Sequence, residues 1–562
     1  MESTQTADSQ RAVSAPDDLT VAEVIERLVH ADPDPFVCLR ELVQNAIDAN
    51  GREIDVGVVF EPDAAHGEPS PDDLGLAELA VEDRGDGMGR EVIEGRLVRL
   101  FASVGDVEPD RIGHLGTGFV TVFALDPTLV VVDSSWRGEH WRVLFDRDRG
   151  YSLRRRPRAS FGTAVRVFKR TRRAEAEALR AAAREALTRW CKHAPATIRF
   201  EGELISRRLE LDAPCTVTIR DDDGELVVGH PEGGVGSRGL YRSGLTLEEG
   251  DDALFPGVSF KVSSKRLHRS MTCEVIRDVT YERCLERVRE AIDLRLSEQV
   301  FTMLEAHVWS SSVADPEAHA ARGEYLYDAA IWHVRRSSRL PLGAEDRAAF
   351  RSPAGLAISL GTVRRALERR GVVFYQPERS PLTDAVEDLG HLVIRLGADS
   401  PGRRLLDALD GQGRVLSVAE RYCMPLKLTA AELEPWRPLT RALAQLVVDA
   451  GGEITGVEVG RFAYEGSSIA DAPAITQEHY GDLSERAKAR GRGRQLLTRL
   501  QALVLNGDLP ELQALAKLAR GEPEFAGYQL ARLLFIGARL DPRLDASLAR
   551  LTVERRWKRT NR

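Results

Sequence analysis

The stretch "RELVQNAIDA" (residues 40–49) places two acids and an amide where a helix would bring them together. Glu41, Asn45 and Asp48 are spaced i, i+4 and i+7, so on an α-helix they share one stripe. The residues between them are largely apolar. The stripe is therefore either a solvated polar face or the wall of a pocket that presents carboxylates and an amide to a ligand.

A second group of candidate ligand-binding residues lies in "VEDRGDGMG" (81–89). Here a predicted strand carries Asp83 into a turn in which Gly85 and Gly87 leave room for a ligand to approach the backbone. The Asp83 carboxylate can accept a hydrogen bond from an exocyclic amine such as that of adenine. Met88 offers a polarizable surface to a flat ring. Because Asp and Gly are also ordinary turn residues, this motif supports a ligand-binding site only in combination with the other motifs.

A third motif is "RIGHLGTGFVTVFALDP" (111–127), in which Gly113, Gly116 and Gly118 lead into an apolar helix over 119–125. A glycine-rich loop at a helix N-terminus presents backbone N–H groups and the positive end of the helix dipole to phosphate. The loop lacks the GK[ST] of a Walker P-loop. There is also no strand followed by the GxGxxG of a Rossmann dinucleotide site.

The order of these motifs, followed by "FGT" (161–163), resembles the split-site ATPase fold shared by gyrases, mismatch-repair ATPases, histidine kinases and the ninety-kilodalton heat-shock chaperones. Within that group, "RELVQNAIDA" and "IGHLGTGF" are most similar to the chaperones. Gyrase-type and mismatch-repair enzymes have differently shaped phosphate loops. A histidine kinase would need a phosphoacceptor helix upstream of the site, where only His30 is found.

This resemblance implies ATP and Mg²⁺ as cofactors. It implies that Asn45 binds Mg²⁺ through its amide oxygen, and that Glu41 orients and deprotonates the attacking water. It further implies that Asp83 binds the adenine amine, supported through water by Thr163. The nucleotide-binding residues that the resemblance implies are Asn45, Asp48, Ala49, Asp83, Gly87, Met88, Arg96, Gly113, His114, Leu115, Gly116, Thr117, Gly118, Phe119 and Thr163.

The resemblance extends more weakly along the rest of the chain. Residues 239–275 are similar to the middle domain of these chaperones. Residues 500–519 are similar to their C-terminal dimerisation region, where a short apolar strand ends in Asn-x-x-x-Pro before a helix. The apolar residues near the C-terminus fit either a dimer interface or an ordinary domain core; they are Leu496, Leu497, Leu500, Leu503, Leu505, Leu530, Leu533, Leu534 and Phe535.

Two positions depart from the family pattern. The family places an arginine that contacts the γ-phosphate in a middle-domain loop, and Cys273 occupies that position here, with Arg269 and Arg277 as possible substitutes. Loss of such an arginine costs roughly 10³-fold in related phosphoryl-transfer enzymes, so we expect slow hydrolysis. The lid segment also lacks the family's lysine, for which Arg96 and Arg99 are the nearest substitutes.

The helices and strands that we expect to position these residues indicate an α+β chain. We expect a disordered tail over 1–16, a Bergerat/GHKL α/β sandwich ATPase domain over 17–192, an α/β middle domain over 193–400, and a mostly helical C-terminal dimerisation domain over 401–562 with one strand pair near 452–465. The first domain should hold one mainly antiparallel sheet. Its predicted helices cover about 34–50 and 173–192, and its predicted strands cover 53–62, 76–83, 129–136, 140–147 and 162–170.

Composition narrows the function classes. The 562 residues suffice for about three or four domains, and the net charge of −9 argues against a protein that coats nucleic acid. The polar, acidic start does not resemble a signal peptide. No apolar run reaches ~18 residues, so no membrane span is expected. Six scattered cysteines indicate a reducing cytosol, and we expect a cytoplasmic protein.

The sequence therefore predicts an ATP-dependent, homodimeric chaperone whose partners are unfolded or partly folded client proteins. ATP would close residues 96–118 as a lid, and hydrolysis would reopen the clamp. One alternative is a catalytically weak nucleotide switch that scaffolds a specific partner, which Cys273 favours and the intact Glu41 opposes. Another is a DNA-acting ATPase of the same superfamily, which the acidic balance disfavours.

Overall fold

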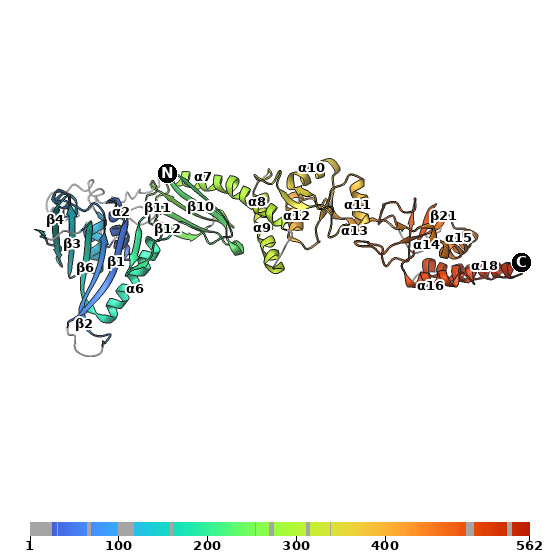
Figure 1. Ribbon diagram of the computed structural model, residues 1–562, viewed down its shortest axis with the longest axis horizontal. Coiled ribbons are helices and arrows are strands. Elements are labelled where there is room, and N and C mark those ends of the chain that lie inside the picture. The colour runs from blue at the N-terminus through green and yellow to red at the C-terminus, as the bar shows by residue number, and fades with distance from the viewer. Residues whose placement is uncertain are drawn as a thin grey trace, which may run out of the picture. The chain divides into compact units, whose positions relative to one another are not determined.

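The structure is a computed structural model with two compact units, residues 1–292 and 293–562, which are described separately below (Figure 1). Helices and strands are mixed in both units, which confirms the predicted α+β class. The structure describes residues 25–27, 29–30, 32–63, 69–98, 117–157, 161–252, 254–268, 275–310, 315–337, 339–489, 500–536 and 542–561. The predicted tail over 1–16 lies outside these ranges.

An eight-stranded sheet forms the first part of unit 1. Its strands are β1 (Glu53–Pro62), β2 (Leu74–Asp83), β3 (Leu129–Trp136), β4 (Glu139–Asp146), β5 (Tyr151–Arg155), β6 (Thr163–Arg172), β7 (Thr197–Phe200) and β8 (Glu203–Leu204). They lie in the order β5-β4-β3-β6-β2-β1-β7-β8. All neighbouring pairs are antiparallel except β1 and β7, so the prediction of a mainly antiparallel sheet is confirmed.

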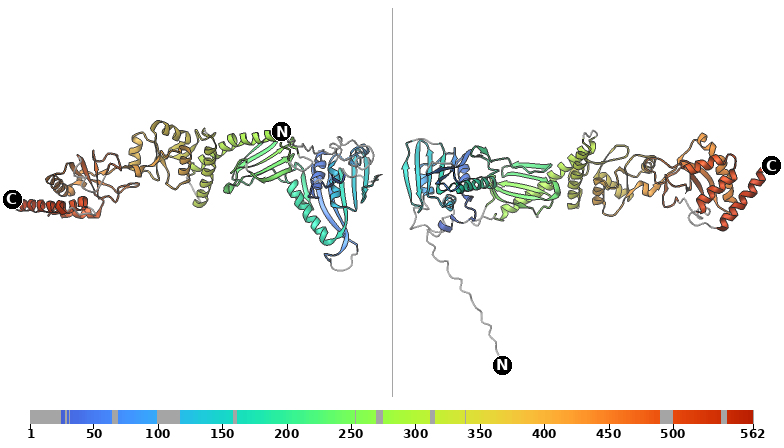
Figure 2. Two further views of the ribbon diagram at one scale, coloured as in Figure 1. Left: turned by 180° about the vertical axis from the view of Figure 1, so that it is seen from behind. Right: turned by 90° about the horizontal axis from the view of Figure 1, so that it is seen from below.

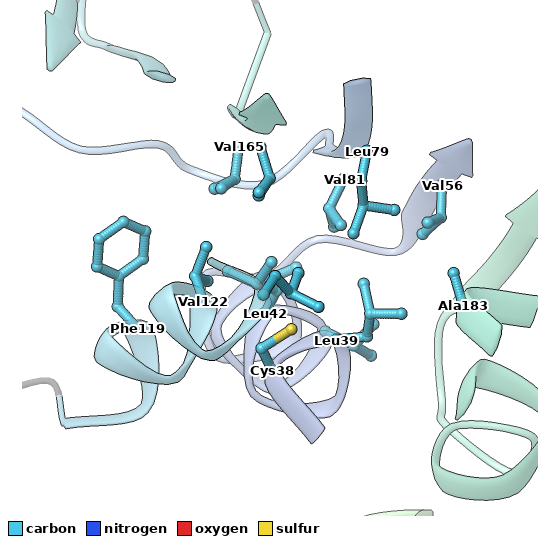
Figure 3. Close-up of a cluster of buried hydrophobic side chains, with 14 of the residues drawn as sticks. Cys38, Leu39, Leu42, Val56, Leu79, Val81, Phe119, Val122, Val165 and Ala183 are labelled. Atoms are coloured by element: carbon cyan, nitrogen blue, oxygen red, sulfur yellow. The ribbon is translucent and has the colours of Figure 1, made fainter. Parts of the chain in front are cut away.

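One face of this sheet is apolar because successive strands place valines opposite each other. Val56 of β1 pairs with Val81 of β2, which pairs with Val165 of β6. Helices α2 (Val37–Asp48) and α6 (Arg173–Trp190) cover this face and lie on the same side of the sheet in the view from below (Figure 2). Figure 3 shows Leu42 of α2 pointing toward Val81 and Val165. Alternation of apolar residues along the strands thus fixes where α2 lies.

Helix α2 ends in a hydrogen-bonded cap that turns the chain toward the sheet. Asn50 adopts a left-handed conformation, with φ 60°. The Gly51 N–H donates to the Ala46 carbonyl over 2.8 Å, and the Asn50 N–H donates to the Ile47 carbonyl over 3.0 Å. These are the two bonds of a Schellman motif. The polar stripe of α2 therefore ends directly before β1.

A five-stranded sheet completes unit 1. Its strands are β9 (Cys215–Asp221), β10 (Gly224–His230), β11 (Ser237–Arg242), β12 (Leu245–Asp251) and β13 (Ser259–Ser264), in the order β12-β11-β13-β10-β9, and α7 (Val279–Glu290) follows them. Strand β12 contacts the first part of the unit directly. Leu245 is buried in the core of the eight-stranded sheet, and the Thr246 hydroxyl donates to the Arg189 carbonyl over 2.8 Å.

Unit 2 begins with a helical layer and two small sheets. Its helices up to residue 421 are α8 (Ser297–Trp309), α9 (Pro316–Arg336), α10 (Leu360–Arg370), α11 (Pro381–Asp388), α12 (Pro401–Asp410) and α13 (Val418–Arg421). Strands β14 (Ala348–Arg351) and β15 (Ala357–Ser359) form a hairpin. Strands β16 (Val373–Gln376), β17 (Val393–Arg395) and β18 (Val415–Ser417) form a parallel sheet with β16 in the centre.

The last part of unit 2 corrects one expectation. The predicted strand pair near 452–465 is wrong: this segment holds one long strand, β21 (Ile454–Arg461). Its neighbours come from elsewhere and form a four-stranded sheet in the order β20-β21-β24-β22, with β20 (Leu426–Lys427), β22 (Ala474–Gln477) and β24 (Gln501–Asn506). The reason is that β21 pairs in parallel with β24, and a parallel partner cannot follow across a tight turn.

Helices α14 (Ala430–Leu433), α15 (Arg437–Asp449), α16 (Pro510–Leu518), α17 (Pro523–Ala531) and α18 (Pro542–Thr560) surround this sheet. The apolar residues Leu503, Leu505, Leu530 and Leu534 lie in its core. For these four, the domain-core interpretation is the one the structure supports.

Among the described residues, no helix is both long and apolar enough to cross a membrane. The five described cysteines are buried and form no disulfide with one another. Burial raises the pKa of the Cys38 thiol to about 12, so this group is not a nucleophile at neutral pH.

Candidate functional site

A pocket of about 530 Å³ opens between α2, the end of β2 and the segment that follows β2. Its apolar wall includes Leu42, Val81 and Val165, which belong to the core between α2 and the sheet. The residues of the predicted nucleotide site that line it are Asn45, Asp48, Ala49, Asp83, Gly87, Met88, Arg96, Phe119 and Thr163. The motifs of 40–49 and 81–89 thus meet around one cavity, although they are separate in sequence.

Asp83 stands at the end of β2, where the strand leaves the apolar layer. Its Oδ1 accepts hydrogen bonds from the Gly85 N–H over 2.8 Å and from the Thr163 N–H over 3.2 Å. Its Oδ2 accepts from no described residue, so this oxygen is available to a donor on a ligand. Burial raises the pKa of Asp83 above its usual value, and the two backbone hydrogen bonds oppose this shift.

The turn after Asp83 holds the backbone close to the neighbouring strands. Gly87 has φ 72°, and a Cβ there would lie 1.9 Å from the Ser135 carbonyl oxygen, so only glycine fits. The Met88 N–H donates to the Ser134 hydroxyl over 2.7 Å. That hydroxyl lies 2.8 Å from the Thr163 hydroxyl. The Ser134 hydroxyl thus links Met88 and Thr163, and the Thr163 N–H holds Asp83.

The polar stripe of α2 forms another wall. Asn45 and Asp48 are exposed and face the pocket. The Gln44 side-chain amide donates to the Asp48 Oδ1 over 2.9 Å. The Asp86 N–H donates to the Ala49 carbonyl over 2.7 Å, which ties the glycine turn to the end of α2. The stripe is thus both solvated and part of a pocket wall, so the two interpretations of "RELVQNAIDA" are compatible at Asn45 and Asp48.

Glu41 does not line the pocket, in contrast to the other two residues of the stripe. Its Oε1 accepts a hydrogen bond from the Arg40 guanidinium over 2.7 Å. Arg40 is only 6% exposed, and its Nε donates to the Thr246 carbonyl in β12 over 3.3 Å. A Cβ on Gly118 would lie 2.7 Å from the Glu41 Oε2, so this carboxylate reaches the start of the helix that follows the glycine loop.

The phosphate-loop prediction falls partly outside the described residues. Gly113, His114, Leu115 and Gly116 lie outside them, as does most of the predicted lid over 96–118, namely residues 99–116. Beyond the loop, the predicted helix is one turn of α-helix, α5 (Thr117–Val120), followed by a 3-10 turn (Thr121–Leu125). Phe119 lines the pocket and is buried. Arg96 lines it too, and it forms no ion pair within the part of the chain that the structure describes.

Of the two predicted substitutes for the missing arginine, only Arg277 belongs to the described residues, and it does not line this pocket. Arg269 and Cys273 lie outside the described residues. Arg277 is exposed, and its guanidinium lies over the Tyr281 ring, 5.9 Å from the ring centroid. It is not one of the residues that line the pocket, so a role for Arg277 in hydrolysis requires a movement of this segment.

Sequence reasoning missed several residues of the site. Asp86 lines the pocket and accepts a hydrogen bond from the Asn50 amide over 2.7 Å. Its position between the two glycines of "DRGDGMG" was a signal that could have identified it. Trp136, at the end of β3, also lines the pocket, but no local pattern indicates that the end of β3 lies beside the turn that follows β2. Ser134 was missed for the same reason.

The polar side chains of the pocket fit a nucleotide that binds together with its own Mg²⁺. Within the described ranges, no three His, Cys, Asp or Glu side chains come together as a metal site. Mg²⁺ commonly binds to one or two protein oxygens together with substrate phosphates, so a single amide such as Asn45 is a sufficient protein ligand. The pocket also combines apolar walls, a carboxylate oxygen that accepts from no described residue, and Arg96, which has no ion-pair partner among the described residues. Such a lining suits a flat heterocycle with an amine and an anionic tail.

No protein-family model matches this chain, and a comparison with curated proteins finds no match either.

The raised pKa of Asp83 leads to a testable pH dependence. If the ionised carboxylate accepts the ligand amine, adenosine should bind less tightly as the pH falls through the raised pKa of Asp83, because protonation removes the charge that attracts the amine. Adenosine is the suitable ligand because it carries no phosphate that would itself titrate. Fluorescence or calorimetric titration from neutral to acidic pH measures the effect. An affinity that stays constant down to about pH 4, the ordinary range of an aspartate, contradicts the assignment.

Proposed function

We propose that this chain binds Mg·ATP in the pocket between α2 and β2, and that it is an ATP-dependent chaperone of the heat shock protein 90 type with a Bergerat/GHKL nucleotide-binding domain. The observation that carries the nucleotide assignment is the convergence of Asn45, Asp83, Met88 and Thr163 on one cavity. The chaperone assignment rests on the order of the sequence motifs, which resembles that family most closely.

In this proposal Asp83 receives the adenine amine on its free Oδ2, and Met88 packs against the ring. Asn45 would hold the Mg²⁺ that accompanies the phosphates, and that ion would offset part of their negative charge. Arg96 supplies a further positive charge at the pocket wall.

Glu41 acts as the base that deprotonates the attacking water. Its ion pair with Arg40 holds Oε1 away from that task, whereas Oε2 lies beside Gly118. The Arg40 side chain is in turn held by the Thr246 carbonyl. We expect slow hydrolysis, because Glu41 must exchange its ion pair with Arg40 for a contact with the attacking water in each cycle.

The same ion pair supports a second candidate, a nucleotide switch with little turnover that scaffolds a specific partner. Steady-state ATP hydrolysis, measured with and without DNA, separates the candidates from one another. Slow turnover that DNA leaves unchanged, together with Mg·ATP-dependent suppression of aggregation of a chemically denatured client, supports the chaperone. Binding without turnover supports the switch, and stimulation by DNA supports a DNA-acting ATPase.

The proposed homodimer leads to a prediction on α18. Val553 and Trp557 are one turn apart on this helix and are 68% and 66% exposed, whereas Leu548 packs into the core. Replacing both exposed residues by glutamate should convert dimers to monomers in light scattering, because two charges would have to be buried in an apolar interface. Lys558→Glu, which adds negative charge at the same end of the helix, is the matched control. A double variant that stays dimeric excludes this face as the interface.

A further inference from the structure

A second and larger pocket lies within unit 1, away from α2. Its volume is about 920 Å³, and it is bounded by β7, β8 and the segment 204–209 on one side and by β9, β10 and β13 on the other. None of the residues that line it also lines the candidate nucleotide pocket. The two cavities are therefore separate sites of the same unit.

Basic side chains dominate the charge of this second pocket. The acids in its lining are Asp221 and Glu225, and both are already paired. Asp221 accepts from Arg287 over 2.5 Å, and Glu225 accepts from Arg220 over 2.7 Å. Four basic side chains in the lining make no ion pair with any described residue: Arg199, Arg207, Arg208 and Lys265. In a chain with a net charge of −9, such a group of unpaired cations around one cavity is a departure from the overall composition.

The backbone at Arg207 is held in place, although the Arg207 side chain is exposed. The Arg207 N–H donates to the Lys192 carbonyl over 2.7 Å. The Arg207 carbonyl lies 3.3 Å from the His193 Nδ1, and the Lys261 ammonium donates to the His193 Nε2 over 3.1 Å. Because Nε2 accepts from the ammonium, Nδ1 carries the ring proton and donates it to the Arg207 carbonyl.

The Lys261 ammonium beside His193 keeps the imidazole neutral, which leaves Nε2 able to accept the hydrogen bond from that ammonium. Burial and the Lys261 charge lower the pKa of His193 to about 4. Glu249 balances the cations below the pocket by accepting from Lys192 over 2.6 Å and from the Tyr241 hydroxyl. Lys192 and His193 thus make the hydrogen bonds of the Arg207 backbone. No described carboxylate pairs with the guanidinium groups of Arg207 and Arg208.

We propose that this pocket binds a small molecule with at least two anionic groups, phosphate or carboxylate. Three guanidinium groups and one ammonium from both sides of the cavity can form charge-assisted hydrogen bonds to such groups, and guanidinium suits them by its planar pair of donors. A volume of about 920 Å³ is within the range of sites for small molecules and cofactors. The inference does not depend on nucleotide binding at α2.

Calorimetric titration of the full chain with tripolyphosphate tests this inference, with citrate as a second probe to separate phosphate from carboxylate recognition. The double variant Arg207→Ala, Arg208→Ala should lose at least about tenfold in affinity for the preferred probe. Arg207→Lys with Arg208→Lys should retain part of it, because the charges remain. Arg154→Ala is the matched control: Arg154 is also exposed and unpaired among the described residues, but it lies on β5, the opposite edge of the eight-stranded sheet.

Two controls separate this site from the nucleotide pocket. Mg·ATP binding should be unchanged in the double alanine variant, which also shows that the variant is folded. Suppose that neither the wild-type chain nor any variant binds Mg·ATP, while the probes still bind in a way that depends on Arg207 and Arg208. The nucleotide assignment then fails, and the assignment of the second pocket stands. Absence of saturable binding of both probes overturns the proposal, as does equal affinity of the double variant. Preference for a short single-stranded oligonucleotide over both probes also overturns it.

Discussion

Asp83→Asn is expected to weaken Mg·ATP binding by roughly a hundredfold or more. The substitution removes a charged acceptor and can turn an amide donor toward the adenine amine, and losing such a hydrogen bond to a charged group costs about 1.5–3 kcal/mol before the unsatisfied donor is counted. Isothermal titration of wild-type and variant chains with Mg·ATP measures the difference. Asp55→Asn on β1 is the matched control, because Asp55 is exposed and does not line the pocket. Normal ATP binding by Asp83→Asn would show that Asp83 does not bind adenine.

The same substitution should not destabilise the unliganded fold. The asparagine oxygen can keep both backbone hydrogen bonds that Asp83 Oδ1 accepts. Since burial raises the pKa of Asp83 in the folded state, the carboxyl contributes stability only at low pH, and that contribution is lost as the pH rises through the raised pKa. At neutral pH the carboxylate is charged, and replacing it by a neutral amide removes the free-energy cost of burying that charge. Thermal unfolding of the two unliganded chains at neutral pH should therefore give an equal or higher midpoint for the variant.

Glu41→Ala should leave Mg·ATP binding nearly unchanged and slow hydrolysis by at least ~10²-fold, the usual scale for loss of a general base. Binding survives because Glu41 does not line the pocket and its carboxylate is engaged by Arg40. Single-turnover hydrolysis and nucleotide titration on the same preparation separate the two effects. Glu185→Ala on α6 removes another glutamate without touching the site and should behave as wild type.

A Glu41→Ala chain that hydrolyses ATP at the wild-type rate excludes Glu41 as the base. A chain that no longer binds ATP instead assigns Glu41 to binding, and the proposed division of roles along the α2 stripe is then wrong.

The sheet of unit 1 was predictable because β1 and β2 alternate in burial and β3 contains a run of three valines. The strands expected at 53–62 and 129–136 match β1 and β3 in full. The missed strands, β5, β7 and β8, are short. Strand β5 also has no fully buried side chain, so the apolar alternation that identifies a strand is absent from it. Strand β7 also depends on parallel pairing with β1, a partner far away in sequence.

The candidate site was predictable where the residues of a single motif have fixed positions relative to one another. Helical spacing placed Asn45 and Asp48 on one wall, and the glycine turn placed Asp83 and Met88 opposite them. The position of Glu41 could not be foreseen, because Arg40 is held by the carbonyl of Thr246, which is 206 residues away. The same limit applies to Trp136 and Ser134, whose proximity to Asp83 depends on the strand order of the sheet.

The most direct test of the central claim is a comparison of Mg·ATP with Mg·GTP by isothermal titration calorimetry of the full chain. Adenine presents an amine to the free oxygen of Asp83, whereas guanine presents a carbonyl oxygen at that position, which a carboxylate repels. We expect one saturable Mg·ATP site per chain and an affinity for Mg·GTP that is at least about a hundredfold lower. Equal affinity for the two nucleotides, or no saturable binding of Mg·ATP, contradicts the assignment of this pocket as an adenine-nucleotide site.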